Sequence, residues 1–446
     1  MSLRARVFII VGSVILVSNL LFLVWWQNWT VKANKNRQAF VKALADARRA
    51  GLPVSAKDLQ APRPPPDQNA APLYTQMQRL VADPYRLRGD DQVAEFLPAA
   101  PTPDQMQATR RALSRRADLM ALIHRAAARP YCVFVRNWSD PTTILFQEDK
   151  YLEMAARFIM AESRVLDWDG KPLEAVRNQA LGFRVARQAY SDKMGIPYLA
   201  AEQIDATTLS GLQKILYHDG SNPAVADAVK AVVEKDYRPL SPAGALRNEF
   251  YEFLVTLDQL RKGGPVSLIR LSGQPAPQGS TSRSSAYWNN FMDQSGLKLI
   301  RRTRRIIDAV DLPFLEAHAV YAAIDTEVEK GRDDTNLVSA ILLPLTDMSE
   351  NRARDTARAE ETRAAAAVLV WKARHGTFPE TLDIVMNPAP VDPFDGKPLR
   401  YRREGAGFVV YSVGKDGKFD GGTSDKKSTT AYLAFHYPMP AYLKTK

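Results

Sequence analysis

The chain has 446 residues, of which 46% are hydrophobic and 24% are charged, and its mean hydropathy is -0.27. This composition excludes a polytopic membrane protein, which would be richer in apolar residues, and a disordered chain, which would be poorer in them. The formal net charge of +11 invites a nucleic-acid interpretation. However, the basic residues are spread along the chain in pairs, without an RNA-binding aromatic signature or zinc-finger spacing. We therefore expect about two or three structural units and no nucleic-acid partner.

An apolar run near the N-terminus predicts a membrane anchor over residues 1–30. Residues 7–26 contain no charge, and roughly 20 residues suffice for a helix to cross a hydrocarbon layer about 30 Å thick. The run ends in Trp25 and Trp26, with Trp29 one turn later, as expected where indole rings lie at the membrane boundary. A cleaved signal peptide is the alternative, but its apolar core is shorter and is followed by small residues.

The positive-inside rule does not decide on which side of the membrane the body lies. Arg4 and Arg6 precede the apolar run, whereas Lys32, Lys35 and Arg37 follow it. A very short basic head usually stays in the cytoplasm. We therefore expect the body on the opposite side, with the lipid bilayer as the partner of the helix.

A stalk and a proline-rich linker are predicted over residues 31–68. The periodicity of residues 31–50 continues as a helix, for which Gly51 and Pro53 are the expected stop. The segment APRPPPD at 61–67 is a stiff, extended spacer.

Helical periodicity dominates residues 69–351. Residues 151–168 and 173–190 predict a helical hairpin around the tight turn 169–172, and it resembles one tetratricopeptide unit. A persuasive solenoid needs about three matching units, so the prediction is a helical bundle or an irregular TPR-like solenoid. Further helices are expected at 197–216, 224–235 and 243–262.

The densest basic cluster comprises Arg301, Arg302, Arg304 and Arg305. It lies in a segment whose apolar residues line one face of a helix. A solvated basic face is the first interpretation, and contact with anionic lipid or cell-envelope polymer is the alternative.

The last hundred residues follow a distinctive order. Residues 357–375 predict a helix that ends at Gly376. The element DPFDGKP follows at 392–398. Two stretches of alternating residues around the turn 404–407 then predict a short antiparallel sheet.

This order resembles the C-terminal part of the major pseudopilin of type II secretion systems. The matching residues are 375–382, 392–398 and 412–422, so the resemblance covers roughly the last fifth of the chain. It implies a small α+β module over residues 352–446 and a body on the periplasmic side of a bacterial inner membrane. The whole chain is also similar to a recurrent group of membrane-anchored bacterial helical proteins, through the segment NAAPLY at 69–74.

The anchor departs from the pseudopilin pattern. Residues 7–26 contain no glutamate, and the leader and Phe-Thr-Leu start of a pseudopilin are missing. A pseudopilin also has no helical body between its anchor and its sheet. The resemblance therefore implies a shared domain in a different protein, and we do not expect incorporation into a pilus-like fibre.

Because the final loop of pseudopilins binds calcium, the resemblance implies a calcium site here. Asp416, Asp420 and Asp425 are the carboxylates available in the matching loop. With backbone carbonyls and water they would supply the six to eight oxygens that calcium prefers. The alternative is a glycine-rich loop with solvated aspartates.

No residue is predicted to be catalytic or to bind a cofactor. The histidines are scattered, and the H-E-x-x-H, G-x-S-x-G, phosphate-binding and dinucleotide-binding motifs are absent. Four acids could form paired carboxylates: Asp167, Asp169, Asp333 and Asp334. However, acids near helix ends and turns commonly cap a helix or are solvated, and we expect that role here. Cys132, the single cysteine, lies in an apolar stretch and is expected to be a small buried hydrophobic side chain.

Two classes of function follow. The first is a non-enzymatic cell-envelope protein that binds protein partners or scaffolds an assembly, with a link to secretion or pilus-like machinery. The second is a membrane-tethered enzyme or ligand sensor with its site in a groove of the helical body. A deep cleft with convergent acids and a histidine would favour an enzyme, whereas an exposed concave apolar face would favour scaffolding.

Overall fold

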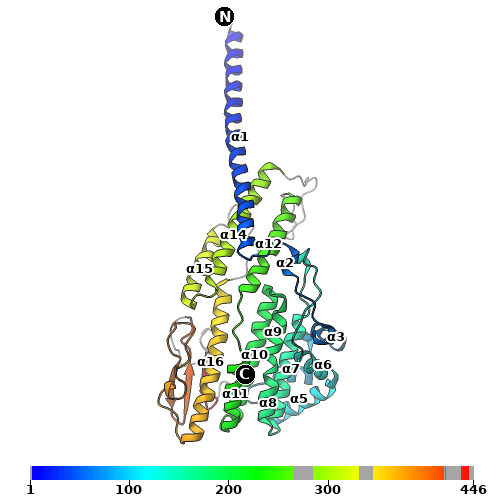
Figure 1. The fold of residues 1–446 in the computed structure, drawn as a ribbon, viewed down its shortest axis with the longest axis vertical. Coiled ribbons are helices and arrows are strands. Elements are labelled where there is room, and N and C mark those ends of the chain that lie inside the picture. Colours follow the sequence, from blue (N-terminus) through cyan, green and yellow to red (C-terminus); the bar gives the residue numbers. More distant parts are fainter. Residues whose placement is uncertain (1–2, 265–284, 331–344, 416, 418–432, 441–446) are drawn as a thin grey trace.

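The computed structural model describes residues 3–264, 285–330, 345–415, 417 and 433–440. A long N-terminal helix projects from a helical body, and a small sheet lies against the far part of that body (Figure 1). The predicted fold class is confirmed: the protein is mostly α, with an apolar N-terminal helix and a short antiparallel sheet near its C-terminus. The tetratricopeptide-like character of the body stays a prediction.

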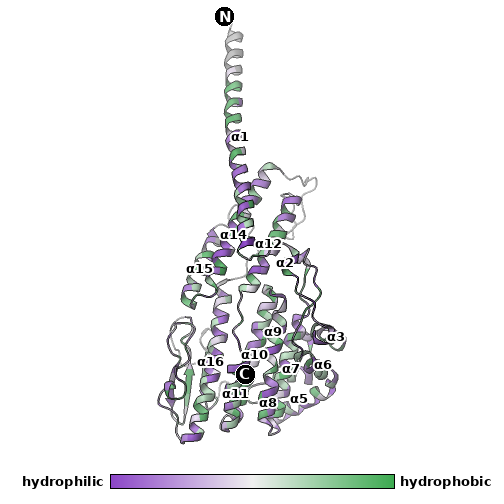
Figure 2. Ribbon diagram, viewed as in Figure 1, coloured by the Kyte–Doolittle hydropathy of each residue, from purple (hydrophilic) through white to green (hydrophobic). Residues whose placement is uncertain are grey.

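Helix α1 (Leu3–Arg49) is continuous and covers both the predicted anchor and the predicted stalk helix. Its hydrophobic side chains from Val14 to Trp26 are exposed, and this part stands outside the body (Figure 2). In the described part of the chain, it is the one helix long and apolar enough to cross a membrane. The chain leaves the helix through Gly51, whose positive φ of 80° favours glycine.

The C-terminal half of α1 is packed into the body. Phe40, Ala47 and Leu52 share a buried cluster with side chains of α12 (Ala243–Gly263) and α14 (Ala286–Ala309). Phe40 lies directly over Gly296, where a Cβ atom would be 2.3 Å from the Phe40 ring. The stalk is therefore part of the folded body.

The body begins with short helices and continues with longer ones. The first group is α2 (Ala56–Leu59), α3 (Ala71–Leu80), α4 (Asp90–Glu95), α5 (Pro103–Arg115) and α6 (Ala117–Ala127). The second group is α7 (Asp149–Trp168), α8 (Pro172–Gln179), α9 (Leu181–Ala189), α10 (Gly195–Asp219), α11 (Pro223–Asp236), α15 (Phe314–Lys330) and α16 (Leu345–His375). Single 3-10 turns lie at Pro66–Gln68, Pro84–Arg86, Pro141–Thr143, Tyr190–Asp192 and Leu382–Ile384.

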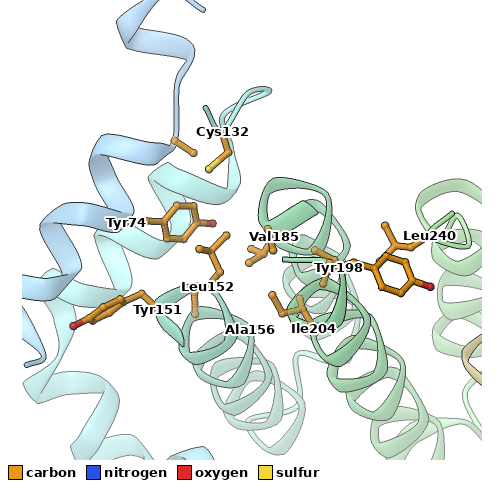
Figure 3. Close-up of a cluster of buried hydrophobic side chains, with 14 of the residues drawn as sticks. Tyr74, Cys132, Tyr151, Leu152, Ala156, Val185, Tyr198, Ile204 and Leu240 are labelled. Carbon is orange, nitrogen blue, oxygen red and sulfur yellow. The ribbon is translucent and has the colours of Figure 1, made fainter. Parts of the chain in front are cut away.

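The largest buried cluster joins α3, α6, α7, α9 and α10 (Figure 3). The Tyr74 hydroxyl donates a hydrogen bond to Gln188 Oε1 (2.6 Å), and the Gln188 amide donates to the carbonyl oxygens of Ala126 and Arg129. The Tyr74 hydroxyl and the Gln188 amide are thus paired inside this core, as buried polar groups need to be. Cys132 is buried beside Tyr74, so its predicted role as a small hydrophobic side chain is confirmed.

The predicted helical hairpin is present, but its second helix is divided at Ala180 into α8 and α9. Glycines allow α10 to approach both pieces closely. A Cβ atom at Gly182 would lie 2.0 Å from Thr208 Oγ1, and one at Gly211 would lie 2.3 Å from Gln179 Nε2. The close approach of α10 accompanies the break.

The sheet has the order β1 (Arg400–Glu404), β2 (Gly407–Tyr411) and β3 (Ala434–Tyr437), and both pairings are antiparallel. The first two strands and the helix end before Gly376 agree with the sequence-based prediction. The sheet and α16 share one hydrophobic core with α10 and α11, in which the Phe435 ring stacks on Tyr217 at 4.6 Å. The predicted domain boundary at 351/352 lies within α16.

The basic cluster on α14 is only partly solvated. Arg301, Arg304 and Arg305 are exposed, and Arg305 pairs with Glu327 at 2.9 Å. Arg302 is buried, so the prediction of a wholly solvated basic face is wrong at this position. The reason is helical periodicity: Arg302 shares a helix face with the buried Leu299 and Ile306.

Candidate functional site

A cavity of about 610 Å³ lies where the start of α12, the helices α15 and α16, and the segment 391–396 meet. This size is typical of small-molecule sites. Most of its wall is apolar. The principal apolar residues are Leu246, Val310, Phe314, Tyr321, Met348 and Phe394.

One wall of the cavity comes from the DPFDGKP element singled out in the sequence. Phe394 is buried and meets Phe314 of α15 edge to face, with ring centroids 4.8 Å apart. Edge-to-face packing is a favourable arrangement for two aromatic rings. The contact joins the C-terminal module to the helical body at the cavity.

Asp392 holds this wall in place. Its Oδ1 accepts hydrogen bonds from the Phe394 amide (3.0 Å) and the Ser412 hydroxyl (2.8 Å). Its Oδ2 accepts from the Val413 amide (2.9 Å) and from Arg400 Nη1 (3.1 Å). The side chain is fully buried, and the four donors compensate its lost hydration. Asp392 thereby ties the DPF turn to the end of β2.

Among the described residues that line the cavity, Arg352 of α16 is the only cation. Its guanidinium donates a hydrogen bond to the Val310 carbonyl oxygen (2.7 Å) and has no carboxylate of a described residue within 4.0 Å. Ser349 and Thr356 flank it on the same helix and also line the cavity. A guanidinium has five N–H donors, so most of its hydrogen-bonding capacity remains for a ligand.

A group of buried acids lies near Arg352, on α10 and α16. Burial raises the pKa of Glu202 to about 8, although the Tyr198 hydroxyl and Arg352 lower it. Burial likewise raises the pKa of Asp205 to about 7, against the effect of Arg187, and that of Asp355 to about 6. Neither Glu202 oxygen has a hydrogen-bond partner of normal geometry. Glu202 is therefore mostly protonated at neutral pH, and the positive charge of Arg352 is only partly compensated.

Asp167, His218 and Asp219 form the group of potential metal ligands found in the described part of the chain. The His218 Nδ1 atom lies 3.1 Å from Asp167 Oδ2 and 3.3 Å from Asp219 Oδ2. However, Arg164 donates to the same Asp167 oxygen at 3.1 Å and brings a positive charge to the site. We interpret the group as an internal ion network and assign it no metal. Asp167 is buried, so its interpretation as a solvated or capping acid is wrong. Asp333 and Asp334 lie outside the described residues.

A second ion network surrounds Arg136. The guanidinium pairs with Glu148 (3.1 Å) and Asp192 (2.9 Å) and lies over the rings of Phe134 and Phe146. Its two carboxylate partners lie just before α7 and just after α9. Its role is to fasten the extended segment that follows α6 to the body.

The predicted calcium ligands Asp416, Asp420 and Asp425 lie outside the described residues. The chain entering their loop is described as far as Lys415, whose ammonium pairs with Glu350 of α16 at 2.9 Å. The loop therefore starts beside the first turns of α16.

Sequence reasoning did not identify Arg352 or Glu202 as site residues. Glu202 lies four residues after the buried Tyr198, on the apolar face of α10, and a carboxyl group at such a position is a usable signal. Arg352 lies in a segment rich in charges and has no such signal. Comparison of the chain with protein families, with characterised proteins and with solved structures finds no match.

Proposed function

We propose that this chain is a membrane-anchored cell-envelope protein that binds an amphipathic anion in the cavity between α15, α16 and residues 391–396. The observation that carries the proposal is Arg352, the one cation among the described lining residues, in a mainly apolar wall. Of the three carboxylates in the lining, Asp392 and Asp395 pair with Arg400, and Glu316 is exposed. An apolar cavity with few placed polar groups favours a ligand with a hydrocarbon body, and a guanidinium favours a carboxylate or phosphate head group. Of the two classes considered above, a ligand sensor fits this lining better than a scaffold.

The apolar helix α1 supports membrane anchoring, and the pseudopilin resemblance favours a body on the outer face of a bacterial inner membrane. A protein at that location is surrounded by amphipathic anions. Long-chain carboxylates and lipid fragments are the simplest ligands with the required chemistry.

Replacing Arg352 with glutamine is expected to weaken binding of a long-chain carboxylate roughly ten- to a hundred-fold. A hydrogen bond to a charged group contributes about 1.5–3 kcal/mol, which corresponds to that range of affinity. The measurement is titration of the full chain in lipid nanodiscs with a fluorescent palmitate analogue.

Two variants make this result interpretable. Arg301→Gln removes an exposed cation from α14, outside the cavity, and should leave the affinity unchanged. Leu312→Trp places a large ring at a half-exposed cavity position and should abolish binding by occupying the space. Equal affinities in the wild type, Arg352→Gln and Leu312→Trp would exclude the cavity as the site.

We propose separately that the loop containing Asp416, Asp420 and Asp425 binds calcium, on the basis of the pseudopilin resemblance. Calcium is then expected to raise the melting temperature of the full chain and to release heat in calorimetry, since a ligand that binds only the folded state stabilises it. The Asp420→Asn and Asp425→Asn double variant should lose both effects. No calcium effect on the wild-type protein would refute the site.

A further inference from the structure

Polar and aromatic contacts join the C-terminal half of α1 to the body. Asn36 donates a hydrogen bond to Asn290 (2.9 Å), and Arg37 pairs with Asp293 of α14 (3.0 Å). Arg261 of α12 pairs with the same Asp293 at 2.7 Å. With Phe40 packed on Gly296, these contacts fix the body to a helix that crosses the membrane.

The part of α1 just before this junction lies at the membrane boundary. Trp26 ends the apolar run, and Trp29 follows about 4.5 Å farther along the helix axis, at 1.5 Å per residue. The head-group layer on each side of the hydrocarbon core is roughly 5–8 Å thick. Trp29 therefore lies within that layer when the apolar run spans the core.

A second element of the body lies at the same height. Tyr287, in the first turn of α14, stacks on Trp29 with ring centroids 6.2 Å apart and an interplanar angle of 12°. Tyr287 is 69% exposed, although it is a large aromatic residue. Its amphipathic ring suits the membrane boundary, where one end is apolar and the other is wet.

We infer that the first turn of α14 rests in the head-group layer of the bilayer that α1 crosses, with Tyr287 as the contact residue. The partner is the lipid surface, because the exposed ring continues the aromatic belt of Trp25, Trp26 and Trp29. The exposed Lys32 on α1 adds a positive charge beside this belt, which favours anionic head groups. The body is thus held to the membrane at two points.

The inference is tested with the full chain in nanodiscs that contain phosphatidylglycerol and lipids with a nitroxide on the head group. The starting background is Cys132→Ala. A single added cysteine, Ala286→Cys, keeps Tyr287 and carries an environment-sensitive fluorophore. The control site is Leu173→Cys on α8, at the opposite end of the body from α1 (Figure 1).

The label at position 286 is expected to lose roughly half or more of its emission to the nitroxide lipids, because it would lie in their layer, whereas the label at 173 keeps its emission. Adding Tyr287→Asp should restore much of the emission at 286 without loss of folding, since Tyr287 is exposed. Equal emission at 286 and 173 would overturn the inference. So would quenching at 286 that Tyr287→Asp leaves unchanged.

Discussion

Replacement of Asp392 with alanine is expected to lower the free energy of unfolding by about 3–5 kcal/mol, because it leaves the donors around this fully buried carboxylate without an acceptor. The Phe394 and Val413 amides, the Ser412 hydroxyl and Arg400 would all lose an acceptor. Urea denaturation of the purified chain, followed by tryptophan fluorescence, measures the change. Since Phe394 forms a wall of the cavity, the same variant should also weaken ligand binding.

Two neighbouring variants separate this effect from a general loss of charge. Asp392→Asn keeps the shape and one acceptor oxygen and should cost less than alanine. Asp395→Ala removes the other carboxylate partner of Arg400. Because Asp395 is partly exposed, that change should cost about 1 kcal/mol or less. Similar small losses for Asp392→Ala and Asp395→Ala would contradict the central role given to Asp392.

The stability of the protein is expected to fall as the pH rises from about 5 to about 9. Burial raises the pKa values of Glu202 and Glu249 to about 8 and that of Asp205 to about 7. Between their ordinary values and these raised values, the folded state holds protons that the unfolded state has released, so rising pH favours unfolding. For Glu202 alone the loss is on the order of 2–5 kcal/mol.

The Glu202→Gln variant isolates this contribution. An amide resembles the protonated carboxyl group, so the variant should match the wild type near pH 5 and exceed its stability near pH 9. Glu380→Gln, at an exposed carboxyl, is the control and should follow the wild-type curve at both values. Denaturation midpoints at the two pH values give the answer. A wild-type stability that rises over this range would contradict the raised pKa of Glu202.

The sequence predicted correctly those elements whose patterns involve neighbouring residues. The apolar run, the helical hairpin and the turn at 404–407 all depend on residues close together in the sequence. Helix α16 begins at Leu345, earlier than the predicted start at 357, because its first turns are charged and are supported by distant contacts such as that of Arg352 with Val310. Strand β3 has four residues and depends on its pairing with β2.

The cavity illustrates the limit of sequence reasoning more clearly. Its walls come from four separate parts of the chain, and the DPFDGKP element was singled out for its resemblance alone. Arg352 and Glu202 belong to helices on which charged residues are usually solvated. Tertiary neighbours decide their burial, and these neighbours become known only when α10, α15 and α16 are assembled.

The continuous helix α1 also has a kinetic consequence. In the proposed membrane-anchored protein, the body packs directly on α1, so these contacts hold it at one height above the membrane plane. Encounters with another membrane-bound molecule then occur in two dimensions and with much of the orientational freedom already removed. A weak contact on that face would therefore act at a high effective concentration, and a soluble version of the body would lose this advantage.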